Sequence, residues 1–194
     1  MSPFDHPIVS ARYFFPRPGA PEDWVEVAVD GAVLACSYRV VDPARPTMLH
    51  FHGNGEIVAD YLHDLEDSVS SFGWNLLLAE YRGYGSSTGT PSLRIMLEDV
   101  EGIFDALGRE PSDLVVYGRS VGSIYAIEFA HRYPGIAGLV LESGIADVLE
   151  RIRLRVSAEE LGTTDEQLRA AVERHLDHAM KLRGFDGPTL VIHA

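Results

Sequence analysis

Five short, nearly continuous apolar runs limit the possible folds of this 194-residue chain more than any other feature. They lie at residues 47–51, 74–80, 114–117, 138–141 and 189–193. Such runs are typical of strands buried on both faces of a parallel sheet, where neither face carries polar side chains. Ahead of them, residues 24–29 and 32–41 flank Asp30 and Gly31, a pattern that predicts an antiparallel hairpin.

Helical segments lie between these runs. We expect helices at residues 57–70, 93–107 and 121–132. Thr90 as an N-cap, with Pro91 at the first helical position, introduces the second helix, and Pro134 ends the third. The alternation of strand and helix predicts an α/β fold in a single domain over residues 1–194. Its sheet is expected to be twisted and mostly parallel, with helices on both faces.

Residues 143–186, between the sixth and seventh strands, form a segment too long for one crossover helix. One helix is expected at 147–156. Thr164 and Gln167 form a capping box for a second helix. Its apolar positions at helical spacing are Leu168, Val172, Leu176 and Met180. We interpret the segment as a short helical cap insert, and two packing helices with no role at a site are the alternative.

Residues 118–122 read G-R-S-V-G, directly between a predicted strand and a predicted helix. A strand that turns at once into a helix strains the residue between them, and side chains at Gly118 and Gly122 would collide in so tight a bend. The pattern therefore predicts Ser120 as an exposed nucleophile. The Val121 N–H, at the start of the helix, is expected to stabilise negative charge beside it.

A second glycine-rich segment, H-G-N-G at residues 52–55, follows the third strand. A loop at this position is expected to supply the other N–H group of an oxyanion hole, and we assign it to Asn54. Flexible Gly53 and Gly55 let the backbone curl toward the serine. An ordinary glycine-rich turn is the alternative.

The motifs HGNG, YRGYGSSTGTPS (residues 81–92) and GRSVGS, in this order, resemble those of the α/β-hydrolase superfamily. Among its members, the chain is most similar to small esterase-like and serine aminopeptidase-type enzymes, from about residue 26 onward. The resemblance implies a serine hydrolase that cleaves a carboxylic ester, thioester or small amide through an acyl-enzyme on Ser120. Arg82 and Tyr84 are expected to make structural hydrogen bonds, with substrate contact as the alternative.

The catalytic acid and histidine are missing from the expected places. The resemblance puts the acid after the seventh strand and the histidine after an eighth, but residue 194 ends the sequence first. Glu142 and Asp147 follow the sixth strand, where Glu142 fits better as a structural residue. None of the eight histidines is a convincing base. We therefore expect the eighth strand to be missing and these residues to be the N-terminal portion of a longer hydrolase.

A non-catalytic hydrolase-fold protein or fragment is the rival hypothesis. It would bind an apolar ligand or form a homo-oligomer through the open edge of the sheet. Cofactors and metals are not expected. His50 and His52 could form a metal pair, but no further ligands follow them closely. The glycines at positions 83, 85 and 89 have the wrong spacing for a dinucleotide site.

Charge and composition exclude further classes of partner. The net charge of −13 disfavours nucleic acids and anionic membranes. A single cysteine, Cys36, excludes an internal disulfide. The N-terminus has no signal-peptide pattern, and no apolar run approaches the length of a membrane span. These observations predict a cytoplasmic protein, and the small acyl substrate is what the resemblance implies.

Overall fold

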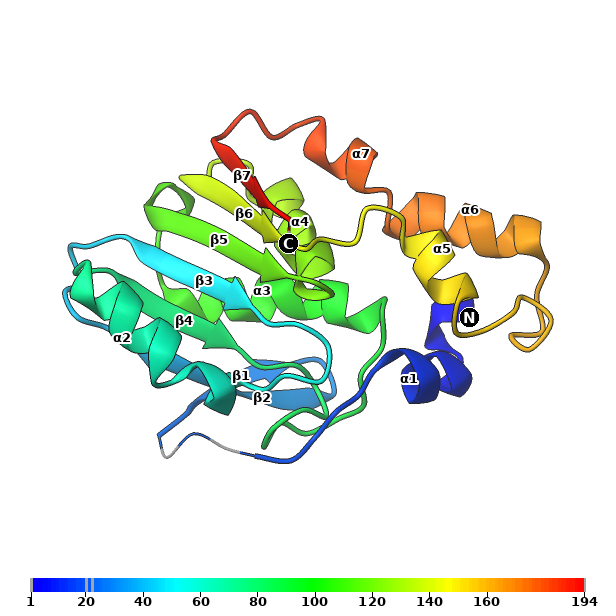
Figure 1. Ribbon diagram of the computed structural model, residues 1–194, viewed down its shortest axis with the longest axis horizontal. Helices are drawn as coiled ribbons and strands as arrows, with labels where there is room; N and C mark the ends of the chain where they lie inside the picture. The colour runs from blue at the N-terminus through cyan, green and yellow to red at the C-terminus, as the bar shows by residue number, and fades with distance from the viewer. Residues whose placement is uncertain (1, 20, 22, 194) are drawn as a thin grey trace.

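A seven-stranded sheet is the central feature of the computed structural model, which describes residues 2–19, 21 and 23–193 (Figure 1). The strands are β1 (Val25–Val29), β2 (Ala32–Arg39), β3 (Thr47–Phe51), β4 (Asn75–Ala79), β5 (Leu114–Arg119), β6 (Gly138–Glu142) and β7 (Thr189–Ile192). Their order in the sheet is β1-β2-β4-β3-β5-β6-β7. Every pairing from β4 to β7 is parallel. The predicted mostly parallel α/β sheet is therefore confirmed.

The β1–β2 hairpin forms where the sequence predicted it, and it joins the sheet through an antiparallel β2–β4 pairing. Val29 pairs with Ala32 across the turn, and Gly31 takes a φ of +70°, which a residue with a side chain rarely adopts. In the middle of the sheet, all five residues of β4 are buried. This burial explains why its sequence is a continuous apolar run rather than an alternating one.

Seven helices cover the sheet and its carboxyl edge within the described residues. They are α1 (Pro7–Tyr13), α2 (Asp64–Ser71), α3 (Ile95–Leu107), α4 (Gly122–Arg132), α5 (Val148–Arg153), α6 (Asp165–His175) and α7 (His178–Leu182). Helix α2 packs on β4 at one face. Helices α3 and α4 pack together on the other face, α3 against β1 and α4 against β3, β5 and β6.

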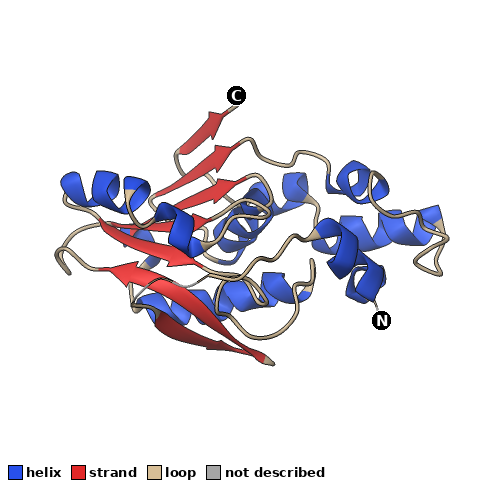
Figure 2. Ribbon diagram, turned by 60° about the horizontal axis from the view of Figure 1, so that its bottom comes forward, coloured by secondary structure: helices blue, strands red, loops and turns tan. Residues whose placement is uncertain are grey.

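Helices α1, α5 and α6 lie together beyond the carboxyl ends of the parallel strands, where Figure 1 shows them beside the N-terminus. The turned view in Figure 2 also shows this helical group to one side of the sheet. The carboxyl edge of a parallel sheet is where ligands bind in folds of this class. The segment 143–186 therefore lies on the side where a site is expected.

Two predicted helix starts are wrong. The helix expected over 93–107 with Thr90 as its N-cap begins at Ile95, and Ser92 rather than Thr90 accepts at its start. The Ser92 hydroxyl accepts the Ile95 N–H at 3.4 Å, and its carbonyl accepts the Met96 N–H at 3.1 Å. The helix expected over 57–70 is divided into a 3₁₀ turn at Val58–Tyr61 and α2.

The segment 143–186 also differs from its predicted form. The first helix is shorter than expected and covers only Val148–Arg153, with Asp147 as its N-cap. The Thr164–Gln167 capping box is confirmed, but the helix that it starts ends at His175. A second N-cap interrupts it, since the Asp177 carboxylate accepts the Met180 N–H at 2.9 Å and starts α7.

A buried ion pair fastens α7 to α4. Lys181 is only 4% exposed, and its ammonium pairs with Glu128, which also accepts a hydrogen bond from Arg132 at 2.7 Å. Burial by itself raises the pKa of Glu128, but the positive charges of Lys181 and Arg132 outweigh it and hold that pKa below its ordinary value. The carboxylate form is thus favoured in the folded chain.

The outer strand, β7, presents an apolar edge. Leu190, Val191 and Ile192 are 55%, 67% and 39% exposed, and β7 pairs only with β6 within the described residues. Such an edge can pair with another chain through its free backbone groups. The homo-oligomer predicted from the sequence remains a prediction.

We expect Val191→Lys to lower self-association of the chain, because a charged side chain on an edge strand opposes pairing. Sedimentation velocity over a range of concentrations would measure this change. The matched control is Phe72→Lys. Phe72 lies at the end of α2, and its apolar side chain is 78% exposed. A wild-type chain that stays monomeric at every concentration would contradict the prediction.

We expect Glu128→Gln to lower the free energy of unfolding by about 3–5 kcal/mol, since it leaves the Lys181 charge buried without a partner. Urea unfolding of the full chain at pH 7 measures this cost. In the wild type, folding lowers the pKa of Glu128 below its ordinary value of 4.5. The pair therefore stabilises the fold at pH values above 4.5, and this contribution declines as the pH falls below 4.5. Asp165→Asn, at an exposed ion pair with Arg153, should cost less than about 1 kcal/mol.

Candidate active site

Ser120 lies in a sharp bend between β5, which ends at Arg119, and α4, which begins at Gly122. Its φ is +50°, a strained conformation for a residue with a side chain. The Ser120 N–H donates to the Glu142 carbonyl of β6 at 2.9 Å, and this bond fixes the bend to the neighbouring strand. The predicted tight strand-to-helix turn is therefore present at the predicted residue.

Both flanking glycines are required by close backbone contacts. A Cβ on Gly122 would lie 2.1 Å from the Phe51 carbonyl oxygen at the end of β3. A Cβ on Gly118 would lie 2.6 Å from both Ala126 Cβ and the Gly122 carbonyl oxygen. Real side chains do not approach so closely, so any larger residue would move the bend away from β3.

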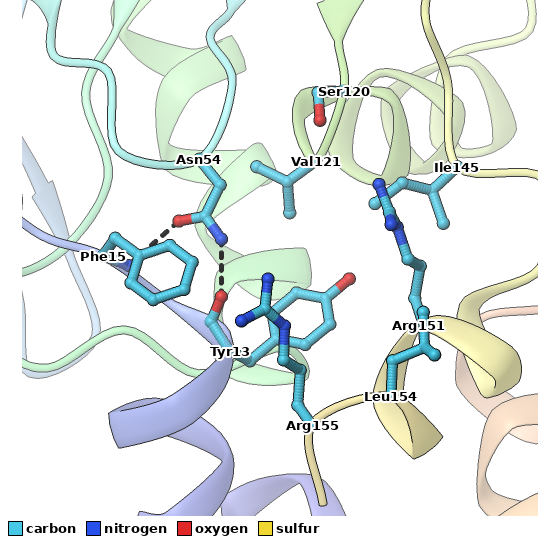
Figure 3. A pocket seen from close by; sticks show the side chains of 9 residues that line it. All are labelled: Tyr13, Phe15, Asn54, Ser120, Val121, Ile145, Arg151, Leu154 and Arg155. Atoms are coloured by element: carbon cyan, nitrogen blue, oxygen red, sulfur yellow. Dashed lines mark hydrogen bonds between the residues drawn. The ribbon is translucent and has the colours of Figure 1, made fainter.

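A pocket of about 320 Å³ opens beside Ser120 (Figure 3). Its walls come from α1, the loop after β3, the Ser120 bend and the segment 143–186. The lining residues are Tyr13, Phe15, Asn54, Ser120, Val121, Ile145, Arg151, Leu154 and Arg155. The structure thus brings together all three site residues predicted from the sequence, Ser120, Asn54 and Val121.

The side chain of Asn54 holds the chain before β1 in place. Its carbonyl oxygen accepts the Phe15 N–H at 3.0 Å and the Tyr84 hydroxyl at 2.7 Å, and its amide donates to the Tyr13 carbonyl at 2.5 Å. By contrast, the backbone N–H groups of Asn54 and Val121 donate to no other described residue. Both N–H groups are therefore free to donate to a bound oxygen atom.

A buried histidine supports the loop that carries Asn54. His52 is 1% exposed, with Nδ1 2.8 Å from the Gly53 carbonyl and Nε2 2.7 Å from the Glu80 carboxylate. The other Glu80 oxygen accepts the Val58 N–H at 3.0 Å. His52 therefore packs beneath the loop and does not line the pocket.

The acidic residues after β6 have structural contacts. Glu142 pairs with Arg119 at 3.4 Å and accepts a hydrogen bond from the Tyr117 hydroxyl. Asp147 accepts the Glu150 N–H at 2.9 Å as the N-cap of α5. Neither lines the Ser120 pocket. The structural role expected for Glu142 agrees with these contacts.

None of the eight histidines lines the pocket among the described residues. His50 packs between the rings of Tyr61 and Tyr117, and burial lowers its pKa to about 3. His178 also lies outside the lining, and burial lowers its pKa to about 4. No histidine of the described chain is therefore assigned as the base for Ser120.

Arg82 and Tyr84 make the structural bonds expected of them. The Arg82 Nε donates to the Asp99 carboxylate at 2.7 Å in a buried pair, and its terminal nitrogen reaches the Asp30 carbonyl at 3.1 Å. Tyr84 is fully buried and accepts the Phe15 N–H at 3.0 Å. The loop that carries them thus ties the hairpin and the N-terminal segment to the core.

The sequence did not identify Tyr13, Phe15, Ile145, Arg151, Leu154 and Arg155 as pocket residues. The only available signal was the interpretation of 143–186 as a cap, since four of the six lie in that segment. Tyr13 and Phe15 had no signal, because they reach the pocket by packing of the N-terminal segment.

The described part of the chain shows neither a cluster of metal ligands nor a membrane-spanning helix. There, no group of three His, Cys, Asp or Glu side chains is placed to hold a metal ion. In the same residues, no helix combines the length and the apolar character needed to cross a membrane.

Known proteins resemble this chain in sequence and in fold. Protein bem46 of Schizosaccharomyces pombe is 32% identical over 114 residues, which are 56% of this chain and 38% of that protein. Alpha/beta hydrolase domain-containing protein 17B of Xenopus laevis is 30% identical over 118 residues, 58% of this chain and 41% of its own. The matches thus span about two fifths of the length of these curated relatives.

A solved structure, Est1E from Butyrivibrio proteoclasticus with ferulic acid bound, superposes with a TM-score of 0.68 at 16% identity. The match covers 87% of this chain and 78% of that one. At this identity the likeness shows the fold alone. The model of the family described as serine aminopeptidase, S33, matches residues 42–194. Because that match covers most of the chain, the chain belongs to this hydrolase family and has the α/β-hydrolase fold.

Proposed function

We propose that the protein is a serine hydrolase that cleaves a carboxylic ester, thioester or small amide through an acyl-enzyme on Ser120. The observation that carries the proposal is the strained Ser120 bend at a pocket where two backbone N–H groups have no other partner among the described residues. A nucleophile on such a bend, beside donors for an oxyanion, is the arrangement that acyl transfer requires.

In the proposed reaction the Ser120 Oγ attacks the substrate carbonyl carbon and transfers its proton to a general base. The Asn54 and Val121 N–H groups stabilise the negative oxygen of the tetrahedral intermediate. The intermediate then expels the alcohol, thiol or amine, which takes up the proton, and water later releases the acid from Ser120. In this fold the acid and the histidine follow the serine along the chain, and we assign neither within residues 1–194.

The size of the pocket favours a small acyl substrate. At about 320 Å³ it lies at the lower end of the range for small-molecule sites. The ligand bound to Est1E, ferulic acid, is a carboxylic acid, and this supports a carboxylic acid derivative as the substrate class.

The segment 143–186 is proposed to act as the cap of this pocket. It contributes Ile145, Arg151, Leu154 and Arg155 to the lining. Within the segment α5 packs on α6, and α7 packs on α4 and so anchors the segment to the sheet domain. These four lining residues support a cap rather than helices that only pack on the fold.

We expect a fluorophosphonate probe to label the full-length protein at Ser120 and to leave Ser120→Ala unlabelled. The phosphorus atom accepts the same nucleophilic attack as a carbonyl carbon, so labelling reports an activated hydroxyl. Mass spectrometry of the modified peptide identifies the labelled residue. Ser123→Ala is the control and should keep the label, because the Ser123 hydroxyl donates to the Ser120 carbonyl and is not the expected nucleophile. A full-length chain that stays unlabelled would favour the non-catalytic alternative.

We expect Gly122→Ala to destabilise the fold by about 1–3 kcal/mol and to slow labelling of Ser120 at least roughly tenfold. The added methyl group would meet the Phe51 carbonyl oxygen and displace the bend. Urea unfolding and the rate of probe labelling measure the two effects. Gly184→Ala is the matched control, because nothing lies within 4 Å of its added carbon, and both measurements should match the wild type.

A further inference from the structure

Two arginines that line the Ser120 pocket have no carboxylate partner among the described residues. Arg151 lies on α5 and Arg155 lies one turn later. Their basic neighbours are paired: Arg153 contacts Glu150 at 3.4 Å and Asp165 at 3.2 Å, and Arg12 contacts Glu160 at 2.7 Å. Figure 3 shows both side chains extending into the view of the pocket from the same segment.

The charge of these two arginines contrasts with that of the whole chain. Acidic residues outnumber lysine and arginine by 29 to 16. The pocket nevertheless has two guanidinium groups and no acidic residue in its described lining. Its local charge is therefore positive on a protein whose net charge is −13.

A buried hydroxyl at the same pocket also has no partner. Tyr13 is 6% exposed, and its hydroxyl forms no hydrogen bond with the described residues. Burial raises the pKa of Tyr13 to about 12, although Arg151 and Arg155 act in the opposite direction, so the hydroxyl keeps its proton at neutral pH. An unpaired buried donor is costly, and a ligand oxygen that accepts from it would remove that cost.

Arg155 has a second contact that orients it. Its guanidinium carbon lies 5.3 Å from the centre of the Phe15 ring, a cation–π distance. The guanidinium is planar, so its N–H groups can bind the two oxygens of a carboxylate or phosphate together, and the contact with the ring limits its orientation.

We propose that the substrate carries an oxyanion, a carboxylate or a phosphate, that is separate from the scissile carbonyl and is bound by Arg151, Arg155 and the Tyr13 hydroxyl. This inference rests on the proposed acyl transfer at Ser120 and narrows its substrate class. The substrates are small esters, thioesters or amides with a negatively charged end. The arginines of the cap segment then select by charge what the serine cleaves.

The test measures binding by calorimetry to full-length Ser120→Ala, which cannot turn its ligand over. The probes are monomethyl glutarate, the methyl ester of phosphonopropionate, and neutral methyl pentanoate. We expect one or both charged esters to bind at least about tenfold more tightly than the neutral ester. The comparison of the two charged esters shows whether carboxylate or phosphate chemistry is preferred.

Arg151→Gln and Arg155→Gln, added singly, should each weaken binding of the charged ester about tenfold and leave the neutral ester unchanged. Both positions are exposed, so the fold should tolerate the changes. Arg153→Gln, on the same helix but paired with Glu150 and Asp165, is the matched control and should change neither affinity. Tyr13→Phe should weaken binding of the charged ester. It should not lower the stability of the free protein, because the Tyr13 hydroxyl has no hydrogen-bond partner among the described residues.

Equal binding of charged and neutral esters, or equal effects of the Arg151, Arg155 and Arg153 substitutions, would overturn the inference even if Ser120 is labelled. Failure of fluorophosphonate labelling with charge-dependent binding intact would instead overturn the proposed hydrolysis alone.

Discussion

The packing of the Ser120 bend against the end of β3 is the contact that holds the candidate site together. Gly122 approaches the Phe51 carbonyl so closely that a single added carbon does not fit. This approach brings α4 to the loop that follows β3, and thus brings Val121 and Asn54 to one pocket. The positive φ of Ser120 is the local strain that accompanies this geometry, and the surrounding sheet maintains it.

The loop with Asn54 is fixed for a different reason. A chain of polar groups runs from the Val58 N–H through Glu80 and His52 to the Gly53 carbonyl, and the core buries it. On the outer side, the Asn54 side chain binds the backbone of the N-terminal segment. Both sets of bonds fix the loop by side chains and leave its main-chain donor free. Preorganised donors of this kind stabilise developing charge without reorganisation.

The charged residues of the pocket come from a different part of the chain than Ser120 and the two backbone N–H groups beside it. The bend and the loop come from the sheet, whereas Arg151 and Arg155 come from the segment between β6 and β7. Tyr13 and Phe15 come from the other end of the chain and complete the wall. Chemistry and selectivity would thus belong to different parts of the chain. A change in the inserted segment would alter the preferred substrate while the bend stays intact.

The sheet, the hairpin and the Ser120 bend could be predicted from the amino-acid sequence, because continuous apolar runs, a turn dipeptide and paired glycines are local patterns with local causes. The same reasoning placed the N-cap of α3 at Thr90 and missed the break between α6 and α7, because hydrogen bonds to Ser92 and to Asp177 fix these two helix starts. The meeting of Tyr13, Arg151 and Arg155 at the pocket arises only in the folded chain. No short-range pattern encodes a contact between residues more than a hundred positions apart; packing alone creates it.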